Sequence, residues 1–233
     1  MSSTVVDSSA PRSARSSDWP ELAVTAWQRL HEKGLAATDQ APRGSLSLRV
    51  PGGETFMLLE SDRPHAPGPQ ALRGAAVGGV AAVHAAVYQS RPDVGGVFIS
   101  QQPWARELIQ LRQTMPAVFD EQVRHLGREV AHAAQPIIAL PPRAHGLLSA
   151  GANAYVFDDF VLCLGLTRER LIFNAELLEK CAKAYVLATL TGQRVGTLPW
   201  LVRFIANRRL RKDEGRAAQA YSRGEMPTGL NAY

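Results

Sequence analysis

Histidine often binds a metal ion or acts as a general base, and this 233-residue chain contains six of them. The histidines lie at positions 31, 65, 84, 125, 132 and 145. No two are two residues apart, as on one face of a strand, or four apart, as on one face of a helix. His125 and His132 are seven residues apart, about two helical turns or roughly 10 Å, which is too far for one zinc ion. The spacing therefore predicts no metal site of the usual kind.

Other signatures of catalysis are missing as well. The sequence contains no glycine-rich phosphate loop ending in Lys-Ser/Thr, no GxGxxG, no GxSxG, no paired CxxC and no HExxH. Its two cysteines, Cys163 in a predicted strand and Cys181 in a predicted helix, indicate buried thiols rather than a disulfide framework. Redox chemistry is not expected.

Three polar residues in apolar surroundings need an explanation. His84 lies on the apolar side of a predicted helix beside Tyr88, where a structural role in the core is favoured over a ligand or base. Asp158 and Asp159 interrupt an apolar strand, and burying an unpaired carboxylate is costly. Either they lie at a strand end facing solvent or an arginine, or they face a pocket and do chemistry; the first interpretation is favoured.

The elements that must position these residues follow from periodicity. Strands and helices alternate, which predicts an α/β layered fold. The predicted helices are Asp18 to Gly34, Ala76 to Gln89, Ala105 to Leu111, Asp120 to Ala133 and Arg168 to Thr191. The predicted strands are two in "SLSLRVPGGETFMLL", one in "VGGVFIS", one in "PIIAL" and one in "AYVFDDFVLCLG".

The chain divides into three parts. Residues 1–17 are rich in serine without an apolar period and are predicted to be a disordered leader. Residues 18–195 form a single predicted domain, and residues 196–233 form a basic amphipathic segment followed by a polar C-terminal tail. No apolar run reaches the roughly 18 residues of a membrane span, so no transmembrane segment is expected. We expect a cytoplasmic location.

The net charge of +5 comes in large part from the stretch "RFIANRRLRK". One local run of this kind is weak evidence for nucleic acid, and no nucleic-acid partner is expected. Leu201, Phe204 and Ile205 give the same segment an apolar side. Packing on the domain or on a neighbouring subunit is favoured over binding to anionic lipid.

Three segments carry a resemblance to the class II aldolase/adducin domain, the family of fuculose and ribulose phosphate aldolases and epimerases and of the adducin head. "GSLSLRVPGG" resembles that family's Gly-Asn-x-Ser-x-Arg segment, and "HAAVYQSRPDVGGVF" its His-x-x-x-Tyr-x-x-Arg-Pro-Asp segment. "LGLTRERLIFNAELLEKCAKAY" resembles the last helix of the family. The resemblance covers about Leu22 to Gly192. It implies a three-layer α/β/α fold with a central mixed, largely antiparallel sheet, and a homo-oligomer, usually a tetramer.

The resemblance also implies where a metal site would lie. Active members hold zinc with a His-x-His pair on the strand after "RPDV" and with a further histidine on a later strand. In this chain the pair falls on Ile99 and Gln101, and the later histidine falls on Asp159. Ile99 offers no lone pair and a glutamine amide is a poor zinc ligand, so we expect no bound metal and no cofactor.

The positions that bind substrate phosphate in the family differ too. Ser45 stands where the family has the asparagine of its first segment, with Ser47 two residues on, and the two serines of a Ser-Ser-Glu stretch become Gly78 and Gly79. These four residues are candidates for binding an anion through hydroxyls and backbone amides. Val80 replaces the glutamate and is neither acid nor base.

Two functions follow as hypotheses. In the first, the chain has lost the zinc site and zinc-dependent aldolase activity, and binds a small anionic ligand or a protein partner. In the second, it is an atypical carbon-carbon lyase or decarboxylase acting on a small hydroxy or keto acid or sugar-acid derivative. Its catalytic candidates are then Asp159, Gln101 and the tail residue Tyr233. A third, less favoured possibility is that Asp158, Asp159 and Gln101 hold Mg²⁺.

Overall fold

The computed structural model describes residues 18–36, 44–73, 78–192 and 194–230, so the predicted leader and Tyr233 lie outside the described residues. The strands are β1 (Ser45–Arg49), β2 (Thr55–Glu60), β3 (Gly68–Ala71), β4 (Gly96–Ser100), β5 (Met115–Pro116), β6 (Glu129–His132), β7 (Ala154–Val156) and β8 (Val161–Gly165). The helices are α1 (Trp19–Glu32), α2 (Gly79–Ser90), α3 (Ala105–Leu111), α4 (Asp120–His125), α5 (Arg168–Leu190) and α6 (Trp200–Ser222), with a 3-10 turn, η2 (Ile137–Ala139).

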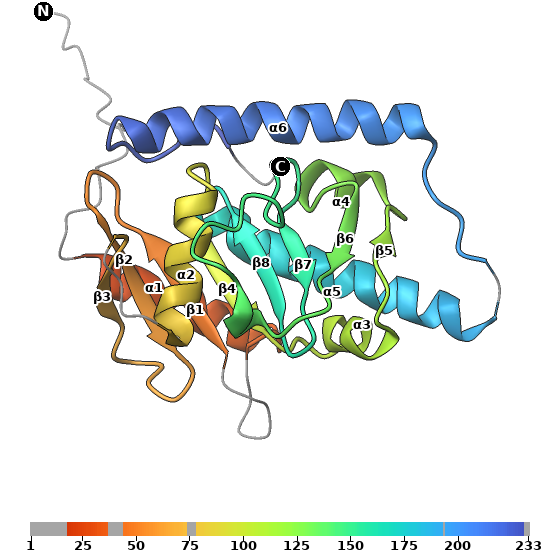
Figure 1. The fold of residues 1–233 in the computed structure, drawn as a ribbon, viewed down its shortest axis with the longest axis horizontal. Helices are drawn as coiled ribbons and strands as arrows, with labels where there is room; N and C mark the ends of the chain where they lie inside the picture. Colours follow the sequence, from red (N-terminus) through yellow and green to blue (C-terminus); the bar gives the residue numbers. More distant parts are fainter. Residues whose placement is uncertain (1–17, 37–43, 74–77, 193, 231–233) are drawn as a thin grey trace, which may run out of the picture.

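The strands form one mixed sheet between two layers of helix. Their order is β3-β2-β1-β4-β8-β7-β6-β5, and every pair is antiparallel except β6 with β7. Figure 1 shows α1 and α5 behind the sheet, α2 in front of it, and α6 lying along the upper end of the molecule. The predicted α/β class, with a mixed, largely antiparallel sheet between helical layers, is confirmed.

The alternation of side chains along the strands divides the core in two. In β1 and β4, Leu46, Leu48 and Phe98 join the cluster that packs on α1 and α5. Val97 and Ile99 point to the opposite face and join the cluster under α2. Ser45 is the register partner of Ile99, so it shares that second face. The sheet therefore carries the candidate residues of β1 and β4 on the side covered by α2.

Three predicted elements differ from the structure. The helix predicted to run to Ala133 ends at His125, because Gly127 turns the backbone at a φ of +118° and the chain continues as β6. "PIIAL" forms the 3-10 turn η2 rather than a strand. The predicted strand 154–165 is a hairpin of β7 and β8 whose turn contains the two aspartates.

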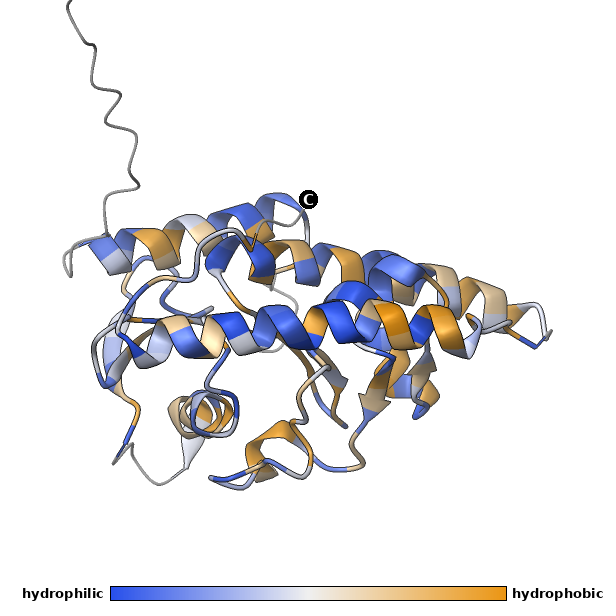
Figure 2. Cartoon of the chain, turned by 90° about the horizontal axis from the view of Figure 1, so that it is seen from above, coloured by the Kyte–Doolittle hydropathy of each residue, from blue (hydrophilic) through white to orange (hydrophobic). Residues whose placement is uncertain are grey.

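The last helix is anchored along one side and open on the other. Leu210, Asp213, Glu214 and Ala217 are buried against the domain. The first two turns instead expose five large apolar side chains, which are Trp200, Leu201, Val202, Phe204 and Ile205. Figure 2, which looks down on α6, shows this hydrophobic start giving way to a hydrophilic surface along the rest of the helix. None of the described helices is long and apolar enough to cross a membrane.

Candidate functional site

The end of β4 is where the resemblance places a metal pair. Ile99 lies in β4, and Gln101 is the first residue after Ser100, where the strand ends. Ile99 is only 3% exposed and packs within the apolar cluster under α2. The Gln101 side-chain Nε2 donates a hydrogen bond of 2.6 Å to the backbone oxygen of Asp159. The structure therefore brings Gln101 and Asp159 together, with Ile99 buried beside them.

The two aspartates lie in the turn between β7 and β8, and both contact other parts of the chain. The Asp159 Oδ1 accepts a hydrogen bond of 2.8 Å from the backbone nitrogen of Ile137 and so caps η2. The Asp158 Oδ1 lies 3.4 Å from the His132 Nε2 and 3.8 Å from an Arg112 guanidinium nitrogen. Both acids thus lie at a strand end and have partners within the protein.

A polar hollow of about 350 Å³ opens at this end of the sheet. Gln101, Asp158 and Asp159 form one wall, and the polar side chains of α3 form the other; these are Arg106, Glu107 and Gln110. The hollow has carboxylates, an amide and a guanidinium, which can hydrogen-bond a small polar molecule. It is the only place where the candidate catalytic residues meet among those that the structure describes.

Zinc is the metal that the resemblance implies, and the residues at its three positions do not fit a zinc ion. Ile99 has no donor atom, and the Gln101 amide nitrogen is engaged with a backbone oxygen. One oxygen of Asp159 is already bonded to a backbone N–H group. Across residues 18–36, 44–73, 78–192 and 194–230, no three His, Cys, Asp or Glu side chains gather as a metal site.

The predicted ligand-binding serines lie in a buried hydrogen-bonded cluster between β1 and α2. The Ser45 hydroxyl is 2.8 Å from His84 Nε2, and the Ser47 hydroxyl is 2.7 Å from His84 Nδ1. Ser47 also bonds the Tyr88 hydroxyl at 2.8 Å. All four side chains are buried. Burial lowers the pKa of His84 to about 3, so the ring is neutral and one nitrogen donates while the other accepts.

The glycine pair stands apart from that cluster, at the start of α2. Gly78 and Gly79 have φ values of +91° and +82°, and both are exposed. A Cβ atom at either position would meet no heavy atom within 4 Å, so the backbone there faces open space. The four predicted anion-binding residues therefore fall into two pairs. The hydroxyls of Ser45 and Ser47 are hydrogen-bonded to His84, whereas Gly78 and Gly79 are exposed to solvent.

A second buried network surrounds Arg91 of the "RPD" segment. Its guanidinium bonds both carboxylate oxygens of Asp93, at 2.9 and 2.7 Å, and reaches Glu214 of α6 at 2.9 Å. Burial alone would lower the pKa of Arg91, but the hydrogen bonds that Arg91 donates to Asp93 and the charges of Asp93 and Glu214 raise it above its ordinary value. Burial raises the pKa of Glu214 to about 7, against the opposing charge of Arg91. This network ties α6 to the end of α2.

Sequence reasoning missed Glu214 as a partner. The residue lies between the basic run and the predicted tail and is surrounded mainly by polar positions. The one available signal was its place at helical spacing from Leu210 and Ala217, which share the buried side of α6.

Comparisons with known proteins bear on the fold. No protein-family model matches the chain, and no curated protein is similar to it. Among solved structures, an L-fuculose 1-phosphate aldolase superposes with a TM-score of 0.69 at 19% identity, over 87% of this chain and all of that one. A putative aldolase/epimerase/decarboxylase from Escherichia coli gives 0.62 at 18% identity, over 81% of this chain and 97% of the other.

An aldolase II superfamily protein from Pseudomonas syringae gives a TM-score of 0.61 at 15% identity, over 92% of this chain and 98% of that one. These likenesses extend over nearly the whole length of each compared chain, so they concern the complete architecture. The chain therefore has the class II aldolase fold, as the resemblance in its sequence predicted.

Proposed function

We propose that this protein has the class II aldolase fold without zinc-dependent aldolase activity, and that it acts by binding a small anionic ligand or a protein partner. The observation that carries the proposal is the end of β4, where Ile99 is buried in the core and Gln101 bonds the backbone of Asp159. Side chains with these roles hold the sheet together. They are not available as metal ligands.

Chemistry supports the same conclusion. Cleaving a carbon-carbon bond next to a carbonyl develops negative charge on oxygen, and a bound metal ion lowers the barrier by several kcal/mol. The positions that would hold the metal do not fit it, and Val80 stands where the resemblance places the proton-transferring glutamate. The residues at these positions therefore replace neither the metal ligands nor the proton-transferring acid.

Metal content tests the proposal directly. We expect purified untagged protein to contain less than about a tenth of an equivalent of zinc, and zinc to give no saturable rise in melting temperature. The control is Ile99→His combined with Gln101→His, which restores a histidine pair on one strand face. This variant should respond to zinc more strongly than the wild type. A wild-type protein that holds close to one zinc ion per chain would refute the proposal.

A homo-oligomer is the protein partner that we propose, with the start of α6 as the contact. Contiguous exposed apolar side chains mark interaction surfaces more often than single ones do, and Trp200 is 69% exposed. Light scattering should show a species larger than the monomer, tetrameric if the resemblance extends to assembly. Leu201→Glu with Phe204→Glu should reduce its mass, whereas Leu190→Glu at the exposed end of α5 should not. A monomeric wild type would remove this part of the proposal.

The alternative function is favoured by one observation, the polar hollow between Gln101, Asp159 and α3. An atypical lyase or decarboxylase for a small hydroxy or keto acid would bind there, with Tyr233 as a further candidate outside the described residues. A screen of such acids would detect turnover that Asp159→Asn removes and that Asp120→Asn, an exposed acid on α4, leaves unchanged. Absence of turnover with the whole substrate class would leave binding as the function.

A cytoplasmic location is part of the proposal. Fractionation of cells that express the tagged chain tests it, since the tag should remain with the cytoplasmic fraction.

A further inference from the structure

A larger hollow lies beside Arg49, at the end of β1 opposite Ser45. Its volume is about 710 Å³, within the range of small-molecule sites. Three arginines line it, together with Tyr88, Gln89 and Leu72. Arg49 ends β1 and Ser45 begins it, a separation of roughly 13 Å along an extended strand. The hollow is therefore distinct from the region of Ser45, Gly78 and Gly79.

Arg49 is the fixed cation of this hollow. Its two terminal nitrogens donate to the backbone oxygens of Pro92, Tyr88 and Arg91 at 3.0 to 3.2 Å. The guanidinium carbon also lies 5.0 Å from the centre of the Tyr88 ring and 5.1 Å from that of Tyr221. These contacts hold the position of the charge without neutralising it, because a carbonyl oxygen carries no formal charge.

The other two cations, Arg73 and Arg143, lie at the surface. Arg73 follows β3, Arg143 follows η2, and both are exposed. Arg73 lies 3.9 Å from Glu54, but both side chains are more than three-quarters exposed, so solvent screens that pair. For Arg143 no ion pair exists within the described residues. Each can therefore turn its guanidinium toward a ligand at little cost.

No carboxylate lines the hollow to balance these charges. The carboxylate whose charge acts on Arg49 is that of Asp93, and both of its oxygens accept hydrogen bonds from Arg91. Burial lowers the pKa of Arg49, because the charge is partly removed from water. Three guanidinium groups around one concave surface attract anions and can form paired hydrogen bonds with a phosphate or carboxylate.

We propose that this hollow binds a small organic anion through a phosphate or carboxylate group. Arg73 and Arg143 contact the charged group, Arg49 supplies a fixed positive field, and Leu72 contacts the apolar part of the ligand. The inference rests on the proposed binding function and deepens it by naming the site and the ligand class. The hollow is too small for a polymer to enter along its length, which favours a metabolite-sized molecule.

Titration of the full chain with inorganic phosphate and with citrate, at constant ionic strength, tests the inference. We expect saturable heat release and a rise in melting temperature with at least one of the two probes. Arg73→Ala and Arg143→Ala should each weaken binding about tenfold, equivalent to about 1.4 kcal/mol, and Arg143→Glu should abolish it. Both residues are exposed, so the variants should fold as the wild type does.

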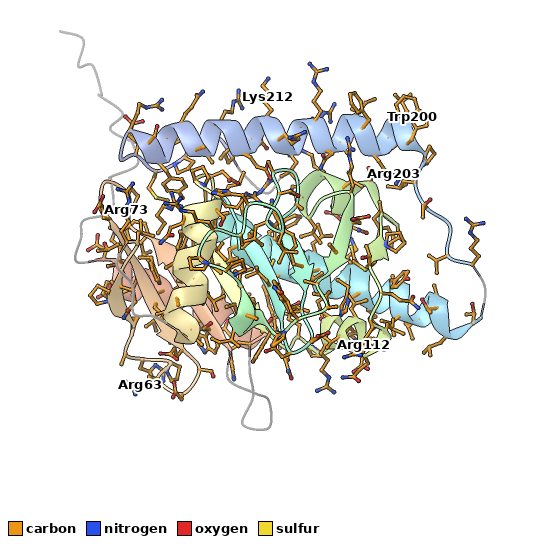
Figure 3. The ribbon with its side chains drawn as sticks, viewed as in Figure 1. Arg63, Arg73, Arg112, Trp200, Arg203 and Lys212 are labelled. Carbon is orange, nitrogen blue, oxygen red and sulfur yellow. The ribbon has the colours of Figure 1, made fainter. Side chains whose placement is uncertain are left out.

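Matched controls locate the binding. Figure 3 shows Arg73 on the side of the molecule nearest α6, with Arg63 and Arg112 at the opposite end. Arg63→Ala should leave affinity unchanged. Arg106→Ala probes the hollow near Asp159, so a loss of affinity there instead would move the site and overturn the inference.

Two further outcomes separate this inference from the proposed function. The anion site would be refuted if neither probe bound saturably. It would also be refuted if Arg63→Ala and Arg143→Ala lost equal affinity for the probe. Neither outcome would change the zinc result. If the protein held one zinc ion per chain and still bound the anion, the proposed loss of the zinc site would be refuted and the anion site would stand.

Discussion

The α2 side of the sheet and the end of β4 use polar residues in opposite ways. Around α2, His84 has a partner on each ring nitrogen, and Arg91 joins two carboxylates in a closed, buried network. At the end of β4, Ile99 is apolar, while Gln101 and Asp159 each bond a backbone group and border an open hollow. The polar residues around α2 therefore have partners within the protein, whereas those at the end of β4 border an open hollow, although Ser45 and Ile99 pair across β1 and β4 on the same face.

The largest expected effect is the loss of fold stability when acid protonates His84 on the α2 side of the sheet. The native pKa of His84 is about 3, below its ordinary value near 6.5 in an unfolded chain. The neutral ring therefore stabilises the fold fully above pH 6.5, and that stabilisation is lost as the pH falls toward 3. The whole contribution is roughly 5 kcal/mol. Urea unfolding at several pH values should show a shallower pH dependence in His84→Gln.

Replacing the exposed His65 by Gln provides the control, and it should leave the pH slope as in the wild type. An unchanged slope in His84→Gln would mean that the serine–histidine cluster opens to water, and the comparison between the two regions would then fail.

Breaking the Arg91 network should have the next largest effect. Arg91→Met leaves Asp93 and Glu214 buried without their cation, and removing one partner of a buried pair costs about 3 to 5 kcal/mol. Chemical denaturation measures the loss, and proteolysis should cut near α6 first because Glu214 anchors that helix. Arg223→Ala, which breaks an exposed pair with Glu225, should change stability by only about 0.5 kcal/mol. Equal effects of the two variants would contradict a structural role for the network.

A smaller change sharpens the assignment of the serines. Ser47→Ala removes a hydroxyl that bonds both His84 and Tyr88, which leaves buried polar groups unsatisfied at a cost of about 1 to 3 kcal/mol. Ser222→Ala on the exposed end of α6 should be close to neutral. If Ser47→Ala weakens anion binding without lowering stability, the serine is a ligand-binding residue, as its place in the sequence predicted.

The smallest effect is expected at the end of β4. Gln101→Leu loses one hydrogen bond to the Asp159 backbone and should destabilise the fold by about 0.5 to 1.5 kcal/mol. Gln110 lines the same hollow from α3, so Gln110→Leu serves as the control. A stabilising effect of Gln101→Leu would reverse the interpretation, because residues kept for function often lower stability.

The sequence predicted local elements well where one periodic pattern was sufficient. Helix α3 has the predicted bounds, the strands around Pro51 pair as expected, and the buried side of α5 contains Leu171, Leu178 and Ala182. The errors occurred where distant segments decide the outcome. Strand β6 exists because it pairs in parallel with β7, and η2 is capped by Asp159, neither of which local periodicity reveals.

The candidate site shows the same limit. The family resemblance assigned Gln101 and Asp159 to positions of one metal site, and the structure places the two residues in contact. Arg49, Arg73 and Arg143 come from three separate segments, and only Arg49 belongs to a segment that the resemblance covers by a motif. Only the folded chain brings them to one surface.

The ion pair between Arg91 and Glu214 joins residues 123 positions apart. During synthesis, Arg91 leaves the ribosome long before its second carboxylate partner exists. The Arg91 network can therefore close completely only after α6 has been synthesised.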